Sequence, residues 1–270
     1  MSVRTTHHAL NFPRDHHMVI SRFHLPATAL CIFGLLVPIK AALADTFYAP
    51  TPAHDDSPDF LGHVEFGYTH LSGNSNSETF LGKAQLTWLK GAWLSRLRGE
   101  ARHASEDSET SAEQYLASFR QRRELVGPHY LFGFGRWEKD RFSGYDHQFT
   151  AIAGYGRQLI DDDRAHLALE AGPGYRADIL PGENDQRLAV AYGALEAGYA
   201  LSDSATLEQE LSLETTRKNS TVRSYTALDT RINAHMSLRL SHEIKHNSDP
   251  PEDAEAKTDR ITSASLRYEF

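Results

Sequence analysis

Apolar and polar residues alternate with a period of two, and this alternation is the feature that most constrains the fold. In the first such run Phe60, Val64 and Phe66 share one face while His63 and Glu65 share the other. Successive side chains of a β-strand point to opposite faces, so this pattern predicts strands with one apolar and one polar face. We predict an all-β chain with about twelve strands, at 60–69, 79–88, 93–102, 115–122, 129–139, 149–155, 167–175, 188–200, 207–215, 222–232, 238–246 and 258–270.

The connections between these runs alternate in length. Short turns are expected near 90–91, 126–128, 161–163, 202–204 and 233–235, and longer polar links at 72–77, 105–112, 139–145, 181–185, 217–221 and 247–256. Tight turns at one end and longer loops at the other are typical of outer-membrane barrels, whose spanning strands need about 9–11 tilted residues. We therefore predict a transmembrane antiparallel up-and-down β-barrel, polar inside and apolar toward lipid.

A soluble barrel such as a lipocalin also alternates, so the strands alone do not decide between the two environments. The last strand decides for us, because Leu266, Tyr268 and the terminal Phe270 share its apolar face. A terminal aromatic residue on an amphipathic strand resembles the signal that the barrel assembly machinery reads. We expect this machinery, outer-membrane lipid and lipopolysaccharide as partners, and the cell outer membrane as the location.

The first 44 residues have the composition of a secretory signal. Arg14 and Arg22 precede a nine-residue apolar stretch at 29–37, and Ala42-Leu43-Ala44 supplies a small-x-small cleavage site. We predict a signal peptide over 1–44, with Met18 as an alternative start that would leave a signal of ordinary length. A proline-rich linker is expected at 45–59 and the barrel at 60–270.

Charge and cysteine content exclude several classes of protein. The 28 Lys and Arg against 36 Asp and Glu give a net charge of −8, which argues against nucleic acid as a partner. Cys31 is the single cysteine, so neither a disulfide scaffold nor a zinc ribbon is possible. His242 and His246 would lie roughly 13 Å apart on a strand, too far to share one metal ion. We expect no metal and no cofactor.

Several stretches resemble one known family. They are Gly-Asn-Ser-Asn-Ser-Glu at 73–78 and the segments 133–146, 153–160 and 169–176. They resemble the DUF481 family of salt-induced outer-membrane β-barrel proteins, and the likeness covers about 61–270. The more specific positions are Arg141, Phe142, Gly144, Tyr145, Asp146, Gly172, Gly174, Tyr175 and Arg176. The resemblance implies an outer-membrane barrel without catalytic residues, and the link to salt or osmotic stress rests on it alone.

Charged residues gather on the polar faces of a few strands. The basic set is Lys83, Arg96, Arg98, Arg102, Arg120 and Arg122, and the acidic set is Glu208, Glu210 and Glu214. The third and ninth strands should lie on opposite walls, with Arg98 and Glu210 at one level. We hypothesise that these residues line a narrow pore, where they either set a transverse field or bridge and plug it; the alternative is scattered charges solvated by trapped water.

The function expected from these observations is a structural or permeability role, as a narrow pore in the outer membrane. The alternatives are an outer-membrane hydrolase and a soluble exported ligand-binding β-barrel. A hydrolase is disfavoured because the serine, histidine and acidic residues come without a Gly-x-Ser-x-Gly elbow. The acidic links either keep the loops soluble, or bind divalent cations against lipopolysaccharide, or repel anions.

Overall fold

The computed structural model describes residues 59–71, 77–106, 109–141, 143–182, 184–252, 254 and 256–270. The expected signal peptide at 1–44, the alternative start at Met18 and linker residues 45–58 lie outside the described residues. Nowhere in the described part is there a helix long and apolar enough to cross a membrane.

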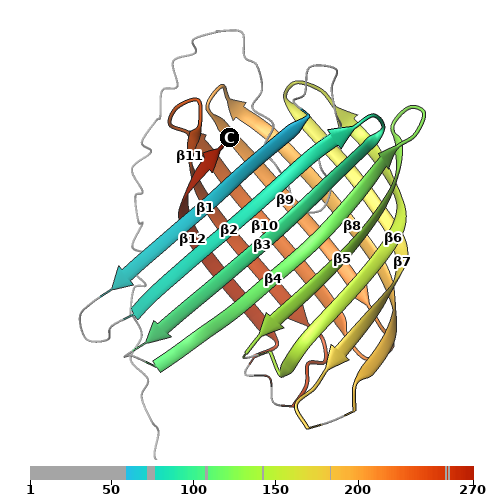
Figure 1. Cartoon of the computed structure of the whole chain (residues 1–270), viewed down its shortest axis with the longest axis vertical. Helices are drawn as coiled ribbons and strands as arrows, with labels where there is room; N and C mark the ends of the chain where they lie inside the picture. The colour runs from blue at the N-terminus through green and yellow to red at the C-terminus, as the bar shows by residue number, and fades with distance from the viewer. Residues whose placement is uncertain are drawn as a thin grey trace, which may run out of the picture. The chain divides into compact units, whose positions relative to one another are not determined.

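Twelve strands close into an antiparallel barrel (Figure 1), which confirms the predicted fold. Each strand pairs with the next along the chain, and β12 returns to pair with β1. The strands are β1 Phe60–Leu71, β2 Ser77–Lys90, β3 Trp93–Glu106, β4 Glu109–Glu124, β5 His129–Asp140, β6 Tyr145–Asp161, β7 Ala165–Ile179, β8 Gln186–Ser202, β9 Ala205–Thr215, β10 Ser220–Arg231, β11 Met236–Asn247 and β12 Thr258–Glu269.

The connections define two ends of the barrel. The short-turn end carries 91–92, 125–128, 162–164, 203–204 and 232–235 together with the C-terminus. The opposite end, which we call the long-link end, carries 141–144, 180–185, 216–219 and 248–257, as far as these links are described. Several strands extend further than predicted. The stretch 105–112 was expected to be a polar link, but β3 continues to Glu106 and β4 begins at Glu109, because backbone pairing can continue where both faces are polar. Period-two alternation reports burial on one face, so it ends before the ladder does.

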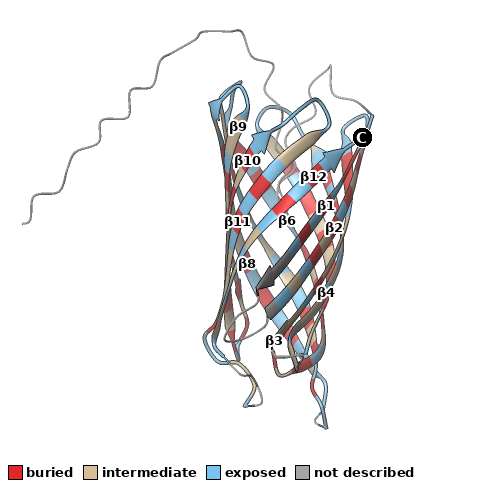
Figure 2. Cartoon of the chain, turned by 90° about the vertical axis from the view of Figure 1, so that its left-hand side faces the viewer, coloured by how far each residue is buried: buried red, intermediate tan, exposed pale blue. Residues whose placement is uncertain are grey.

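Burial is inverted relative to a soluble barrel, as Figure 2 shows by the alternation of buried and exposed residues along the strands. Large apolar side chains are exposed on the outer face, whereas charged side chains are buried inside. The outer face carries, among others, Phe66, Tyr68, Trp93, Tyr115, Phe149, Tyr155, Tyr175, Tyr268 and Phe270, while Trp88 is half-buried.

The seam that closes the barrel is its shortest. Between β1 and β12 the described residues form four pairs, from His63↔Glu269 to Phe66↔Leu266. Backbone hydrogen bonds in both directions between Gly62 and Phe270 extend this pairing at the short-turn end. On its other side β1 pairs with β2 along all twelve residues. Toward the long-link end, β1 therefore keeps its ladder on one side only.

Candidate functional site in the lumen

Charged side chains from opposite walls meet inside the barrel. The sequence-predicted Lys83, Arg96, Arg102, Arg120, Arg122, Glu208, Glu210 and Glu214 are all buried there, and Arg98 is half-buried. Each comes from the polar face of its strand, because the interior is the one place in such a barrel where charges can pair. That they line a conducting pore remains a prediction.

One set of ion pairs joins β5 to the opposite side of the barrel. Glu138 on β5 accepts a hydrogen bond from Nη2 of Arg223 on β10 at 2.9 Å and another from Nε of Arg136 at 2.8 Å. Nζ of Lys245 on β11 lies 4.0 Å from both Glu138 Oε1 and Asp140 Oδ2. Because β5 and β11 are six positions apart in the ring of twelve, these contacts cross the full width of the lumen.

A second set of contacts joins β2 and β3 to β11. Lys83 donates to Oε1 of Glu243 at 3.0 Å, and Nη2 of Arg102 lies 3.5 Å from Oε2 of the same carboxylate. Arg102 also donates to Gln114 at 2.9 Å, which in turn donates to Asp140 at 3.1 Å. A continuous hydrogen-bonded chain therefore runs from β11 across β3 and β4 to β5.

The acidic row on β9 pairs with residues that the sequence did not single out. Glu214 accepts two hydrogen bonds from Nη2 of Arg136 on β5, at 2.8 and 3.0 Å. Glu208 lies 3.2 Å from Nη2 of Arg239 on β11, whose guanidinium also binds Asp229 at 2.6 Å. The acidic row of β9 is therefore joined to β5 through Glu214 and to β11 through Glu208.

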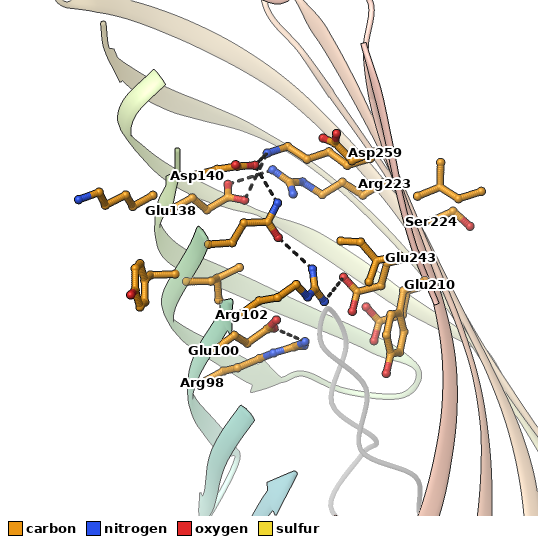
Figure 3. A pocket seen from close by; sticks show the side chains of 18 residues that line it. Arg98, Glu100, Arg102, Glu138, Asp140, Glu210, Arg223, Ser224, Glu243 and Asp259 are labelled. Atoms are coloured by element: carbon orange, nitrogen blue, oxygen red, sulfur yellow. Dashed lines mark hydrogen bonds and ion pairs between the residues drawn. The ribbon is translucent and has the colours of Figure 1, made fainter. Parts of the chain in front are cut away.

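Arg98 on β3 and Glu210 on β9 come from opposite walls, as predicted, and line one cavity of about 130 Å³ (Figure 3). Arg98 also forms an ion pair with Glu100 on its own strand. The lining contains both cations and carboxylates, among them Arg102, Glu138, Arg223 and Glu243. Such a cavity has room for water and small ions, and its charges can attract either sign.

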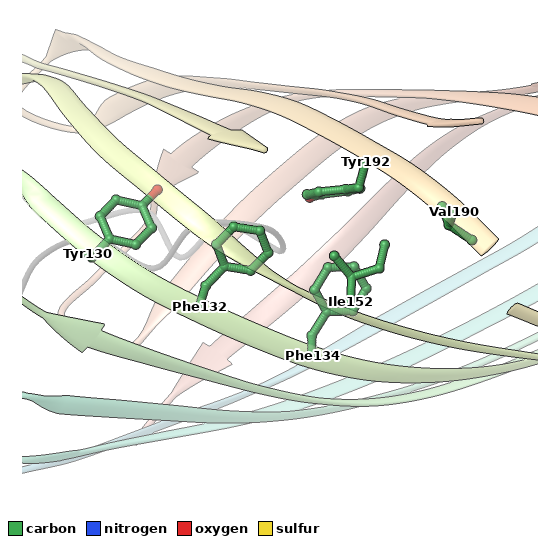
Figure 4. Packing of buried hydrophobic residues seen from close by; sticks show 6 residues of the cluster. All are labelled: Tyr130, Phe132, Phe134, Ile152, Val190 and Tyr192. Atoms are coloured by element: carbon green, nitrogen blue, oxygen red, sulfur yellow. The ribbon is translucent and has the colours of Figure 1, made fainter. Parts of the chain in front are cut away.

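An apolar cluster fills the lumen on the β5–β8 side (Figure 4). It consists of Tyr130, Phe132, Phe134, Ile152, Val190 and Tyr192, all buried. The guanidinium of Arg122 lies over the Tyr130 ring at 3.6 Å, and that of Arg120 lies 4.9 Å from the Phe132 centroid. Arg120 also forms an ion pair with Glu170 on β7. Alternation alone did not predict this cluster, because apolar faces were expected to point to lipid. Gly133 and Gly135, which alternate with these rings and face outward, were the available signal.

The family-motif residues serve the ends and the wall of the barrel. Gly144 adopts a φ of +76° in the β5–β6 link, where an added Cβ would lie 2.9 Å from Pro251 of the β11–β12 link. Two links on opposite sides of the ring therefore meet at the long-link end. Exposed Arg141 pairs with Glu113 at 3.3 Å, Tyr145 is buried and Asp146 is exposed, whereas Phe142 lies outside the described residues.

The other motif segment lies on β7. Gly172 and Gly174 face the interior where β6 and β7 approach closely: a Cβ on Gly172 would lie 2.3 Å from the Ala153 carbonyl oxygen. Tyr175 is exposed on the outer face, and the buried Arg176 binds Asp178 at 3.1 Å. On β7 the motif residues therefore set the spacing between two strands and form a buried ion pair.

The expected assembly signal lies on the outer face of the closing seam. Leu266, Tyr268 and Phe270 are all exposed. The Phe270 ring covers Gly62 so closely that an added Cβ there would lie 2.5 Å from it. Recognition of these residues by an assembly machinery remains a prediction.

Among the described residues, no group of three or more His, Cys, Asp or Glu is placed to hold a metal ion.

Fold and lumen together define a class: a closed antiparallel barrel with an apolar exterior and an ion-paired interior. Residues 64–270 match the family described as "Protein of unknown function, DUF481", and the chain belongs to that family, as its motifs predicted. It is 32% identical over 246 residues to the uncharacterized protein YdiY of Escherichia coli (strain K12), covering 90% of this chain and 97% of that protein.

Two solved structures share part of the course of this chain. The COG4313 outer membrane channel from Pseudomonas putida F1 is 9% identical, with a TM-score of 0.49 over 78% of this chain and 95% of that one. The translocator domain of the autotransporter NalP from Neisseria meningitidis is 12% identical, with a TM-score of 0.46 over 80% of this chain and 90% of that one.

Proposed function

We propose that this protein is an outer-membrane β-barrel with a permeability role, a narrow pore whose lumen is held closed by ion pairs that cross it. The apolar exterior supports a lipid environment, because only a membrane favours a barrel with charges inside and large apolar side chains outside. The contact of Glu138 with Arg223 and Lys245 carries the proposal, since it joins walls five and six positions apart.

The partial exposure of these pairs supports a connection with salt. Glu243 and Arg223 are 25% and 18% exposed at the cavity, whereas Arg136 and Glu214 are 1% exposed. Dissolved ions screen exposed charge pairs more than buried ones. High salt therefore weakens the pairs at the cavity first and leaves the more buried pair of Arg136 and Glu214 intact.

Two measurements test this function. Cell fractionation should recover the protein in the outer membrane with heat-modifiable mobility, whereas a soluble ligand-binding barrel would be free in the periplasm. Single-channel recording of refolded protein should give small conductances that rise with salt more steeply than the bulk conductivity of the solution. A membrane barrel that is silent at every salt concentration contradicts the pore and leaves a structural role.

A further inference from the structure

A row of polar side chains crosses the outer face of four strands at mid-height. Gln209 on β9 is directly opposite Thr226 on β10, Thr226 is opposite His242 on β11, and His242 is opposite Thr262 on β12. Each lies near the middle of its strand. In the barrel proposed above, these groups lie at the depth where the surrounding lipid is hydrocarbon.

The other eight strands are apolar at the same position. Their outward mid-strand residues are Phe66, Ala84, Gly99, Ala117, Gly135, Ala153, Ala171 and Gly193. Apolar residues also flank the polar row, for example Leu207, Leu228 and Leu240 on the side of the short-turn end. The polar row is therefore confined to one wall of the barrel, which we name the β9–β12 wall.

The row is only partly satisfied by its own hydrogen bonds. Thr226 donates to Gln209 Oε1 at 2.6 Å, and Gln209 Nε2 donates to the Glu210 carbonyl oxygen at 3.0 Å and to the Ser224 hydroxyl at 3.1 Å. Nδ1 of His242 lies 2.8 Å from the Thr262 hydroxyl, so the unsatisfied group is the outer nitrogen of the imidazole. His242 is exposed, and its Nε2 has no hydrogen-bond partner among the residues that the structure describes. Lipid tails offer neither donors nor acceptors, so polar groups left facing them are unfavourable.

We propose that the β9–β12 wall is a contact surface for a second copy of this chain within the membrane. An amide, two hydroxyls and a neutral imidazole each contain a donor and an acceptor, so the row can hydrogen-bond to its own copy. A two-fold symmetric contact requires such self-complementarity. The two rows would cross near Thr226 and His242, at the centre of each.

The shortest seam of the barrel borders the same wall, which supports the proposed contact. β12 borders β1 through four residue pairs, against eleven with β11. A second barrel packed beside β12 would brace this seam from outside. The polar row and the short seam therefore lie next to each other. One partner could hydrogen-bond to the row and cover the seam. The inference rests on the proposed membrane location.

The test compares a variant of the row with a matched control in bilayers. The variant combines Gln209→Leu, Thr226→Val, His242→Leu and Thr262→Val, and the control is Gln121→Leu, an exposed polar residue on β4. Energy transfer between labelled copies in phospholipid vesicles should show association of the wild type and the control. The variant should require at least a tenfold higher protein-to-lipid ratio, and heat-modifiable mobility shows whether it has folded; the milder His242→Ala is used if it has not.

Cysteine cross-linking in native membranes gives an independent result. In a Cys31→Ser background, Thr226→Cys should form disulfide-linked dimers, whereas Ala117→Cys on β4, six positions away in the ring, should not. Membrane-inserted wild type that stays monomeric at every density, or equal cross-linking at both positions, overturns this inference alone. Recovery of the barrel in the soluble fraction overturns the proposed function as well.

Discussion

Arg136 on β5 and Glu214 on β9 form an ion pair across the lumen, with Nη2 of the arginine 2.8 and 3.0 Å from the two carboxylate oxygens. Both side chains are almost fully buried. The two strands are four positions apart in the ring, so this contact ties together walls that share no backbone hydrogen bonds. Such cross-lumen pairs make the barrel a filled structure rather than a wide channel.

Removing one partner of this pair should destabilise the barrel strongly. In Arg136→Met the buried Glu214 loses its main counter-charge, and breaking a buried pair in this way costs about 3–5 kcal/mol. Urea-induced unfolding from lipid vesicles measures the change. The control is Arg141→Met, which removes an exposed pair with Glu113 and should change the free energy of unfolding by no more than about 1 kcal/mol. Equal effects at the two sites would contradict a structural role for the buried pair.

Neutralising Glu138 should open the lumen. Glu138→Gln removes the charge that holds Arg223 and Lys245 across the barrel, so conductance should increase. The cavity also becomes more positive, which shifts selectivity toward anions. Single-channel recording under a salt gradient measures both, with Glu113→Gln as the control because that carboxylate pairs with Arg141 at the exposed end of the barrel. A Glu138→Gln barrel that matches the wild type in both readouts would exclude this pair as the closing contact.

Adding a methyl group at Gly172 should disturb the wall between β6 and β7. Its Cβ would lie 2.3 Å from a backbone carbonyl oxygen, so the ladder itself must shift. Gly99→Ala is the matched control, because a Cβ on Gly99 meets nothing within 4 Å. We expect Gly172→Ala to lower the free energy of unfolding by about 1–3 kcal/mol, the usual cost of overpacking a core. Gly99→Ala should leave it nearly unchanged. Similar unfolding curves for both would show that the close approach is not needed.

A charge on the apolar exterior should be penalised according to depth. Leu86→Arg places a cation on the outer face of β2, away from the strand ends, and should cost about 2–4 kcal/mol in the free energy of folding into a bilayer. Leu201→Arg lies near the short-turn end, where an arginine reaches the interface and costs about 0–1 kcal/mol. Folding titrations in phospholipid vesicles compare them. A larger penalty at Leu201 would place the membrane differently on the barrel.

The tertiary structure revealed features of the wall and lumen that periodicity did not predict. Tyr130, Phe132 and Phe134 face inward, so an apolar residue on β5 is not evidence of a lipid-facing position. Gln209 and His242 are polar but face outward at mid-strand, where β1 to β8 carry apolar residues. On β5 apolar residues occupy both faces, whereas on β9 and β11 polar residues interrupt an outer face that is otherwise apolar. Alternation along one strand does not show which of its faces is turned to the lumen.

The sequence by itself determined the twelve strands, their two faces and the membership of Lys83, Arg98 and Glu210 in the polar face. It could do so because side-chain direction along a strand depends only on local geometry with a period of two. Only the tertiary structure decided which charges meet: Lys83 and Glu243 are 160 residues apart in the chain and 3.0 Å apart in space. Such contacts depend on the tilt and register with which the ring closes, and both are set by all twelve strands together.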